Sequence, residues 1–478
     1  MDGSWLALAL LLPGITMALW LRLLWPKAVP GRWPLVLGYG YLLGMLGVAA
    51  LLWFQGVLGW PLTSGMPLTV SGLLLVAAVF LLVQRPSAAG TTWQPARERL
   101  NLWQSLAFGL ILLWVVARWV GLALEVWWQP LFPWDAWTTW GARAKVWSEL
   151  QTLVPFVSPE AWLADRTGTL HTIGAWGYPL TISLVATWPT LVLGNWNETA
   201  ANLPWLGVGL ALGLGFYGQA RLWGASPLTA LVFVWLVMSV PLLNTHVALA
   251  GYADLWMATA YGLALMAFLQ WVRGGDQRQG WLAILLMLIC VAIKREGLVW
   301  AALFIPALLA AKLGKFSLLM VGGVLVALGG LLWVLGGLAL EVPGLGAIRL
   351  SADLIQLPLI GEMRLENHAP WEPVLRHYFL YSNWHLFAYL VVLSLVAASV
   401  SLWRAPDQAW QRAGLVWALG SIAALYFLFF WTDAYLWAIQ ATSINRLLLH
   451  FMPAFLFWSM TVWLEVAGYR QDSPKTRP

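Results

Sequence analysis

Cysteine is nearly absent from this 478-residue chain, because Cys290 is the only one and it lies inside an apolar run. A single cysteine excludes an intramolecular disulfide and a cysteine-based metal site. The chain also lacks Walker, HExxH and GxSxG patterns, so nothing supports a nucleotide as a direct substrate donor.

Charge is equally scarce, at 10% of residues against 61% hydrophobic residues, whereas a soluble protein typically carries about 25% charged residues. Together with a mean hydropathy of +0.75, this predicts an integral membrane protein. The formal net charge is +6, but no basic cluster with interleaved aromatic residues appears, so a nucleic-acid partner is not expected.

Apolar runs of about 20 residues recur along the whole chain and predict an all-α, polytopic protein with about 12 to 14 membrane spans. The sequence shows no internal repeat and no appended soluble domain. The expected segments are 4–24, 34–58, 66–84, 101–124, 176–194, 202–219, 227–246, 254–272, 281–293, 297–311, 316–340, 384–403, 412–431 and 447–468.

Lysine and arginine in short loops predict the orientation of the spans. They place 125–175 and 341–383, the two longest polar loops, on the outer side, and 469–478 in a cytoplasmic tail. Long loops in a compact domain are usually functional, so we expect the functional site on the outer side of the membrane. Between 176 and 246 the count is inconsistent, since three segments are found where an even number is needed. One segment there is re-entrant, or a boundary is misplaced.

The stretch Phe132 to Lys145 opens the first large polar loop and contains Asp135, Arg143 and Lys145. A helix beginning near Asp135 would place Arg143 on the same face as Asp135. The neighbouring stripe of that helix would consist of Trp137, Trp140, Ala144 and Trp147. A carboxylate near two cations beside a bilayer suits an enzyme handling a phosphate-bearing lipid. A surface anchor with tryptophan at headgroup level explains the pattern equally well.

Two further stretches supply candidates near the ends of spans. His171 and Tyr178 flank the close of the first large loop, although an interfacial tyrosine and a solvated histidine would look the same. Asp254 begins an apolar segment. An acid at a membrane boundary is costly and is a functional candidate, and it is also a good helix N-cap.

Two clusters of charge later in the chain could hold a phosphate. Lys294 and Glu296 lie in a turn between two short apolar runs, and lysine binds phosphate as a point charge. Arg446 opens the last span, with His450 one turn deeper. Snorkelling side chains at a membrane edge are the alternative for both. The mixed-charge loop 341–383 shows no metal-ligand spacing.

Taken in order, these pieces resemble the GT-C superfamily of membrane glycosyltransferases, in the branch of protein O-mannosyltransferases and the lipid A aminoarabinose transferase. The closer likeness is to a bacterial subgroup with a WDAW stretch in its first large outer loop. The motifs behind this resemblance are Trp134 to Trp137, Tyr178 to Leu180, Ala253 to Leu255, Lys294 to Gly297, and Arg446 to Pro453.

The resemblance implies a GT-C-like bundle with a helical first outer loop, and a polyprenyl-phosphate sugar as donor. It makes Asp135 the general base and assigns the lipid phosphate to Lys294 and Arg446, with Arg143 or Lys145 as further candidates. Asp254 and His171 would shape the cavity. The chain departs from the family in having one acid in this loop, which leaves a second acid and a divalent metal open.

The implied domains are additional helices at 1–100 and a catalytic module at 101–468. The implied function is transfer of a sugar, with inversion, to a lipid, glycan or protein acceptor on the outer face of a bacterial inner (plasma) membrane. Three alternatives remain: a cell-envelope glycan ligase or polymerase, a lipid or solute transporter, and a scaffold without chemistry. A transporter should show repeat symmetry, and none is found.

Overall fold

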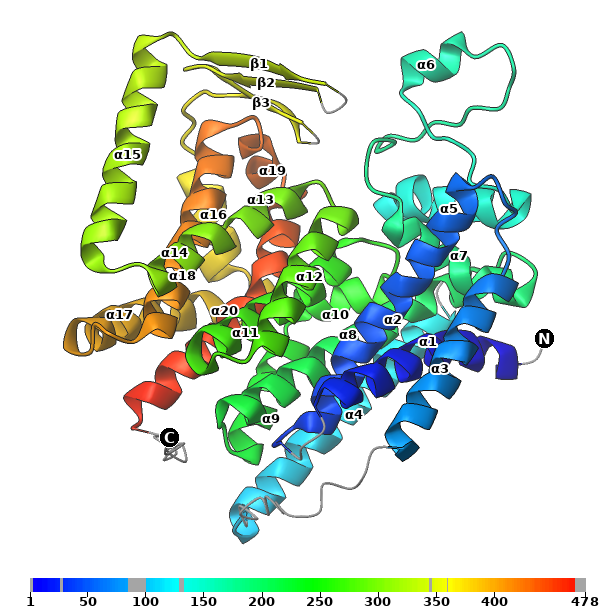
Figure 1. Cartoon of the computed structure of the whole chain (residues 1–478), viewed down its shortest axis with the longest axis horizontal. Helices are drawn as coiled ribbons and strands as arrows, with labels where there is room; N and C mark the ends of the chain where they lie inside the picture. Colours follow the sequence, from blue (N-terminus) through cyan, green and yellow to red (C-terminus); the bar gives the residue numbers. More distant parts are fainter. Residues whose placement is uncertain are drawn as a thin grey trace. The chain divides into compact units, whose positions relative to one another are not determined.

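The computed structural model describes residues 3–25, 29–84, 100–128, 133–343, 346–358 and 360–468, and it is mainly helical (Figure 1). Arg85, Arg97 and Arg99, Lys27, Phe132 and the tail 469–478 lie outside the described residues. In the described part, nine helices are long and apolar enough to cross a membrane, which supports a multi-pass membrane protein. They are α1 (Gly3–Leu24), α2 (Arg32–Val57), α3 (Gly65–Gln84), α4 (Leu102–Trp128), α8 (Glu198–Trp223), α11 (Asp254–Gly274), α17 (Phe387–Arg404), α18 (Ala409–Trp431) and α20 (Ile444–Val466).

The stretch between 176 and 246, where the sequence count is inconsistent, contains irregular helices. Helix α7 (Thr181–Leu193) has 13 residues and is only about 20 Å long, which is short for a membrane span. Helices α9 (Pro227–Met238) and α10 (Pro241–Ala248) form a pair bent by 65°. Proline favours the first turn of a helix, and Pro241 begins the second member of this pair.

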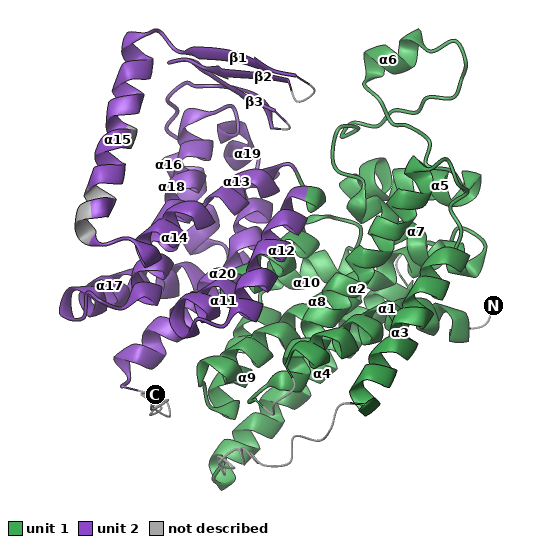
Figure 2. Ribbon diagram, in the orientation of Figure 1, with its two compact units in different colours: residues 1–266, 292–294 green, residues 267–291, 295–478 purple. Residues whose placement is uncertain are grey.

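The chain divides into two compact units (Figure 2). The first consists of residues 1–266 and 292–294. Within it, α2 packs closely against α8. A Cβ on Gly38 would lie 2.3 Å from the backbone nitrogen of Gly215, so position 38 requires glycine. Gly213, Gly215 and Gly218 form a Gly-x-Gly-x-x-Gly run in the middle of α8, where small residues allow helices to approach.

A buried hydrogen-bond chain also joins three helices of the first unit. The Gln219 side-chain amide donates to the Tyr39 hydroxyl at 2.7 Å, and that hydroxyl donates to the carbonyl of Leu263 at 2.8 Å. Helices α1 and α2 also pack against α7 and α8 within this compact unit. The functional division at residue 100 stays a prediction.

The second unit consists of residues 267–291 and 295–478. Its further helices include α12 (Gln277–Ile293, which runs into the first unit), α13 (Glu296–Ala302), α14 (Phe304–Lys312), α15 (Lys315–Val334), α16 (Trp371–Leu375) and α19 (Tyr435–Ile439). A π-helical turn, η2 (Arg376–Leu380), continues α16, and a 3₁₀ turn, η3 (Ser382–Trp384), follows it.

A four-stranded antiparallel meander in the second unit is the element that the sequence analysis does not predict. Its strands are β1 (Leu338–Val342), β2 (Gly346–Leu350), β3 (Leu354–Leu357) and β4 (Gly361–Arg364), paired in sequence order. Gly346 and Gly361 begin strands with φ of 112° and 102°, a conformation that glycine adopts readily. Strands of four or five residues carry too little alternation to stand out in a polar loop.

Candidate functional site

The first large loop is helical, as expected, and its helical register decides which side chains face inward. It begins with the π-helical turn η1 (Ala136–Trp140), continues as α5 (Gly141–Leu150), and carries a short exposed helix, α6 (Pro159–Ala164), further on. Asp135 is half-buried at the start of η1. Because a π turn bonds residues five apart rather than four, it shifts the faces relative to a plain α-helix.

The observed burial corrects the expected stripes. Trp140, Ala144 and Trp147 are buried together as expected, but Trp137 is 50% exposed and packs against Trp134 instead. Arg143, which was expected on the face of Asp135, is fully buried beside Ala144 and Trp147. Lys145 is exposed on the opposite side of α5. The two cations of this stretch therefore have different environments.

Arg143 acts as a clamp on the chain before α7. Its two terminal nitrogens donate to four backbone carbonyls, those of Ala175, Trp176, Tyr178 and Pro179, at 3.0 to 3.3 Å. Burial lowers the pKa of Arg143 to about 10, which is still well above neutral, so the guanidinium remains charged. Its planar fork suits several acceptors at once. Arg143 thus holds the segment that carries Tyr178.

Phe156 backs this clamp and links it to His171. The guanidinium carbon of Arg143 lies 5.4 Å from the centre of the Phe156 ring, and that ring lies 5.6 Å from the His171 ring. His171 also forms a backbone bridge with Phe156. His171 therefore contacts Arg143 through Phe156. Its backbone bridge to Phe156 joins the two ends of the segment that carries α6.

Tyr178 connects the loop to the end of α12. Its ring packs edge-on against Trp140, with centroids 5.5 Å apart. The Nζ of Lys294 lies 6.0 Å from the centre of the same ring. At this distance an ammonium is attracted to the face of a tyrosine ring. The Tyr178 ring thus lies between Trp140, the last residue of η1, and the buried Lys294.

Asp254 and Lys294 form a buried ion pair, with 2.9 Å between Oδ1 and Nζ and side-chain exposures of 0% and 6%. Forty residues separate them in the chain, and each was expected as a separate site candidate. Asp254 is the first residue of α11, where a carboxylate also suits the helix dipole. The N-cap alternative and the functional interpretation are therefore compatible.

Four of the expected residues, Arg143, Tyr178, Asp254 and Lys294, are thus connected in the first unit. We call them the Asp254–Lys294 cluster. Asp135 begins the π turn whose last residue, Trp140, contacts the cluster through Tyr178.

No family model, curated protein or solved structure matches the chain.

Glu296, Arg446 and His450 belong to the second unit. Arg446 is half-buried in the first turn of α20, and His450, one turn further, is fully buried. The indole N–H of Trp300 donates to Nδ1 of His450 at 3.2 Å. A Cβ on Gly297 would meet the carbonyl oxygen of Cys290 at 2.0 Å, so the glycine after Glu296 permits the tight turn from α12 into α13.

Sequence reasoning missed a second histidine site at the start of α20. The indole of Trp384 donates to the side-chain oxygen of Asn445 at 3.0 Å, and the Asn445 amide nitrogen lies 2.9 Å from Nδ1 of His377. Because an indole only donates, the amide of Asn445 must donate to His377. Burial lowers the pKa of His377, so a neutral ring with its proton on Nε2 fits. Only the position of Asn445 beside Arg446 hinted at this site.

The described residues contain no group of three or more His, Cys, Asp or Glu side chains placed to hold a metal ion. The divalent metal left open by the sequence therefore has no ligand set among them.

Proposed function

We propose that the protein is a membrane glycosyltransferase that moves a sugar from a polyprenyl-phosphate donor to an acceptor on the outer face of a bacterial plasma membrane. The observation that carries the proposal is the Asp254–Lys294 cluster. It joins motifs of the first outer loop, the α11 start and the α12 end, and these are the motifs on which the resemblance to GT-C enzymes rests.

In this mechanism Asp135 orients or deprotonates the acceptor hydroxyl, a contribution typically worth about 10²–10⁴-fold. Lys294 stabilises the charge that grows on the leaving phosphate. Arg446, in the second unit, stays a phosphate ligand implied by the resemblance alone. Asp254 holds Lys294 charged and aimed at Tyr178, and Arg143 positions the Tyr178 segment from behind. Arg143 is therefore a positioning residue rather than a phosphate ligand. A single displacement inverts the anomeric centre.

The decisive experiment compares Asp135→Asn with Glu160→Gln, an exposed acid on α6 of the same loop, in purified protein supplied with polyprenyl-phosphate sugars. Asp135→Asn should lose transfer by about 10²-fold or more and still bind the donor. Glu160→Gln should retain both properties. Unchanged transfer in Asp135→Asn would remove the base assignment.

One observation favours a second candidate, a lipid or solute transporter. Transporters bind their substrates at broken helices, and α9 and α10 form a helix pair with a 65° bend. Reconstituted vesicles distinguish the two functions, since a transporter moves an intact substrate across the bilayer and an enzyme releases polyprenyl phosphate.

A further inference from the structure

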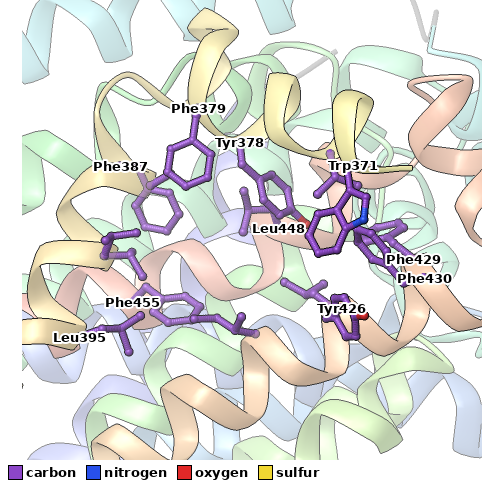
Figure 3. Close-up of a pocket in the computed structure, with 16 residues that line it drawn as sticks. Trp371, Tyr378, Phe379, Phe387, Leu395, Tyr426, Phe429, Phe430, Leu448 and Phe455 are labelled. Atoms are coloured by element: carbon purple, nitrogen blue, oxygen red, sulfur yellow. The ribbon is translucent and has the colours of Figure 1, made fainter. Parts of the chain in front are cut away.

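An apolar cavity of about 320 Å³ lies within the second unit, between η2, α17, α18 and α20 (Figure 3). Each of these elements contributes apolar side chains to the lining, among them Val391, Phe429 and Leu448. None of the lining residues is charged. The volume is at the lower end of the range for ligand pockets, about 300–1,000 Å³, and therefore suits part of a lipid rather than a whole one.

The cavity extends from one end of the three spans to their middle, where Leu395 and Phe455 line it. On α17 the lining begins at Phe387, the first residue of the helix, and on α18 it extends to Phe430, one residue before the helix ends. The segment α16–η2 contributes the remaining wall. The end of the cavity at Phe387 and Phe430 lies at the level where aromatic side chains meet the membrane interface. Trp371 and Tyr426 are part of the lining.

Tyr378 provides the distinctive chemistry. In Figure 3 its ring lies between Leu448 and Trp371, among the side chains of the lining. Its hydroxyl is buried and has no hydrogen-bond partner among the described residues. Burial raises the pKa of Tyr378, so the hydroxyl remains a neutral donor. A buried donor without an acceptor costs free energy, and an acceptor on a ligand would remove that cost.

We propose that this cavity binds one acyl chain of an ester-linked glycerolipid, with the Tyr378 hydroxyl donating to the ester carbonyl. Charge complementarity selects this occupant. An ester carbonyl is an uncharged acceptor at the head of an apolar chain, and it lies at the interface. A polyprenyl phosphate carries an anion at that position, and the lining offers no cation to pair with it. The site goes beyond the proposed transfer reaction and does not depend on it.

The test uses the full-length protein in lipid nanodiscs with photoactivatable phosphatidylcholines. Two probes carry the same diazirine on one chain, and they differ in being a diester or a dialkyl ether. We expect labelled peptides from 371–395 and 422–430. The diester should label about three- to tenfold more than the ether, as one neutral hydrogen bond provides.

Tyr378→Phe should reduce diester labelling to the ether level and leave ether labelling unchanged. The matched control is Tyr381→Phe, an exposed tyrosine three residues further along that does not line the cavity. Ala388→Trp should fill the cavity and suppress both probes, whereas Leu393→Trp, on the exposed side of the same helix, should not.

Three results would overturn the proposal. They are equal labelling by diester and ether probes in the unmodified protein, labelling confined to peptides outside the lining, and displacement of the label by polyprenyl phosphate. The last result would give the cavity to an isoprenoid lipid. Tyr378→Phe removes one oxygen only, so the test remains decisive even if Ala388→Trp does not fold.

Discussion

The two units differ in whether they bury full charges. The first unit buries full charges, since Arg143 donates to four carbonyls and Lys294 pairs with Asp254. The second unit instead buries two histidines that have neutral hydrogen-bond partners. The partner of His450 is the indole of Trp300, and the partner of His377 is the amide of Asn445, which the indole of Trp384 orients. A buried charge left without its partner costs far more than a lost neutral hydrogen bond. The chemistry of ions is therefore expected in the first unit, and substitutions there should have the largest effects.

The sharpest way to test this difference is Asp254→Asn. Removing the anion breaks a buried ion pair, which should destabilise the fold by about 3–5 kcal/mol. The matched control is Asp276→Asn, whose pair with Arg278 is similarly short, at 2.8 Å, but has side-chain exposures of 29% and 45%. Exposed pairs are worth about 0–1 kcal/mol. Thermal unfolding in detergent measures both changes.

A double substitution sharpens the result. Asp254→Asn with Lys294→Met removes both charges and should recover much of the lost stability, because a buried pair replaced by apolar groups is often neutral. If the single and double variants are equally unstable, the cost comes from packing and not from the unpaired charge.

Arg143→Lys should have the next largest effect. A lysine keeps the charge but loses the fork that reaches four carbonyls, at a cost of about 2–3 kcal/mol. Hydrogen exchange should increase at residues 175–179, the segment that carries Tyr178. Lys145→Gln, on the exposed side of the same helix, should change stability by less than about 0.5 kcal/mol. Unchanged exchange at 175–179 would contradict the positioning role.

A smaller effect is expected for Trp300→Phe in the second unit. The substitution removes the indole donor to His450 while keeping an aromatic ring, so the expected loss is about 1 kcal/mol. Trp333→Phe, on a highly exposed position of α15, serves as the control with no expected change. A loss as large as that of Asp254→Asn would erase the contrast between the two units.

The smallest effect is expected for the pH dependence of stability at His377. Burial lowers the pKa of His377 below its ordinary value of 6.5, so the unfolded chain binds a proton more readily than the folded one. Stability from this residue is present above pH 6.5 and falls as the pH drops below it. The unfolding temperature of His377→Gln should decline less between pH 7.5 and 5 than that of the unmodified protein. Parallel curves would show that His377 does not contribute.

The apolar segments could be predicted from the sequence, because a membrane span needs about 20 consecutive apolar residues and this signal is local. The candidate residues Arg143, Tyr178, Asp254 and Lys294 could also be selected, since charge and aromatic rings at the edges of such segments are conspicuous. The β1–β4 meander could not be predicted, because its strands have only four or five residues and β1 begins within the expected apolar segment 316–340.

The sequence by itself therefore determined a helical membrane protein and a set of candidate site residues. Only the tertiary structure decided their pairing. Arg143 proved to be buried against backbone carbonyls of residues 175–179, and helix packing joined Asp254 to Lys294 across 40 residues. The physical reason is that hydropathy acts along the chain, whereas the partner that compensates a buried charge is set by which segments meet in space.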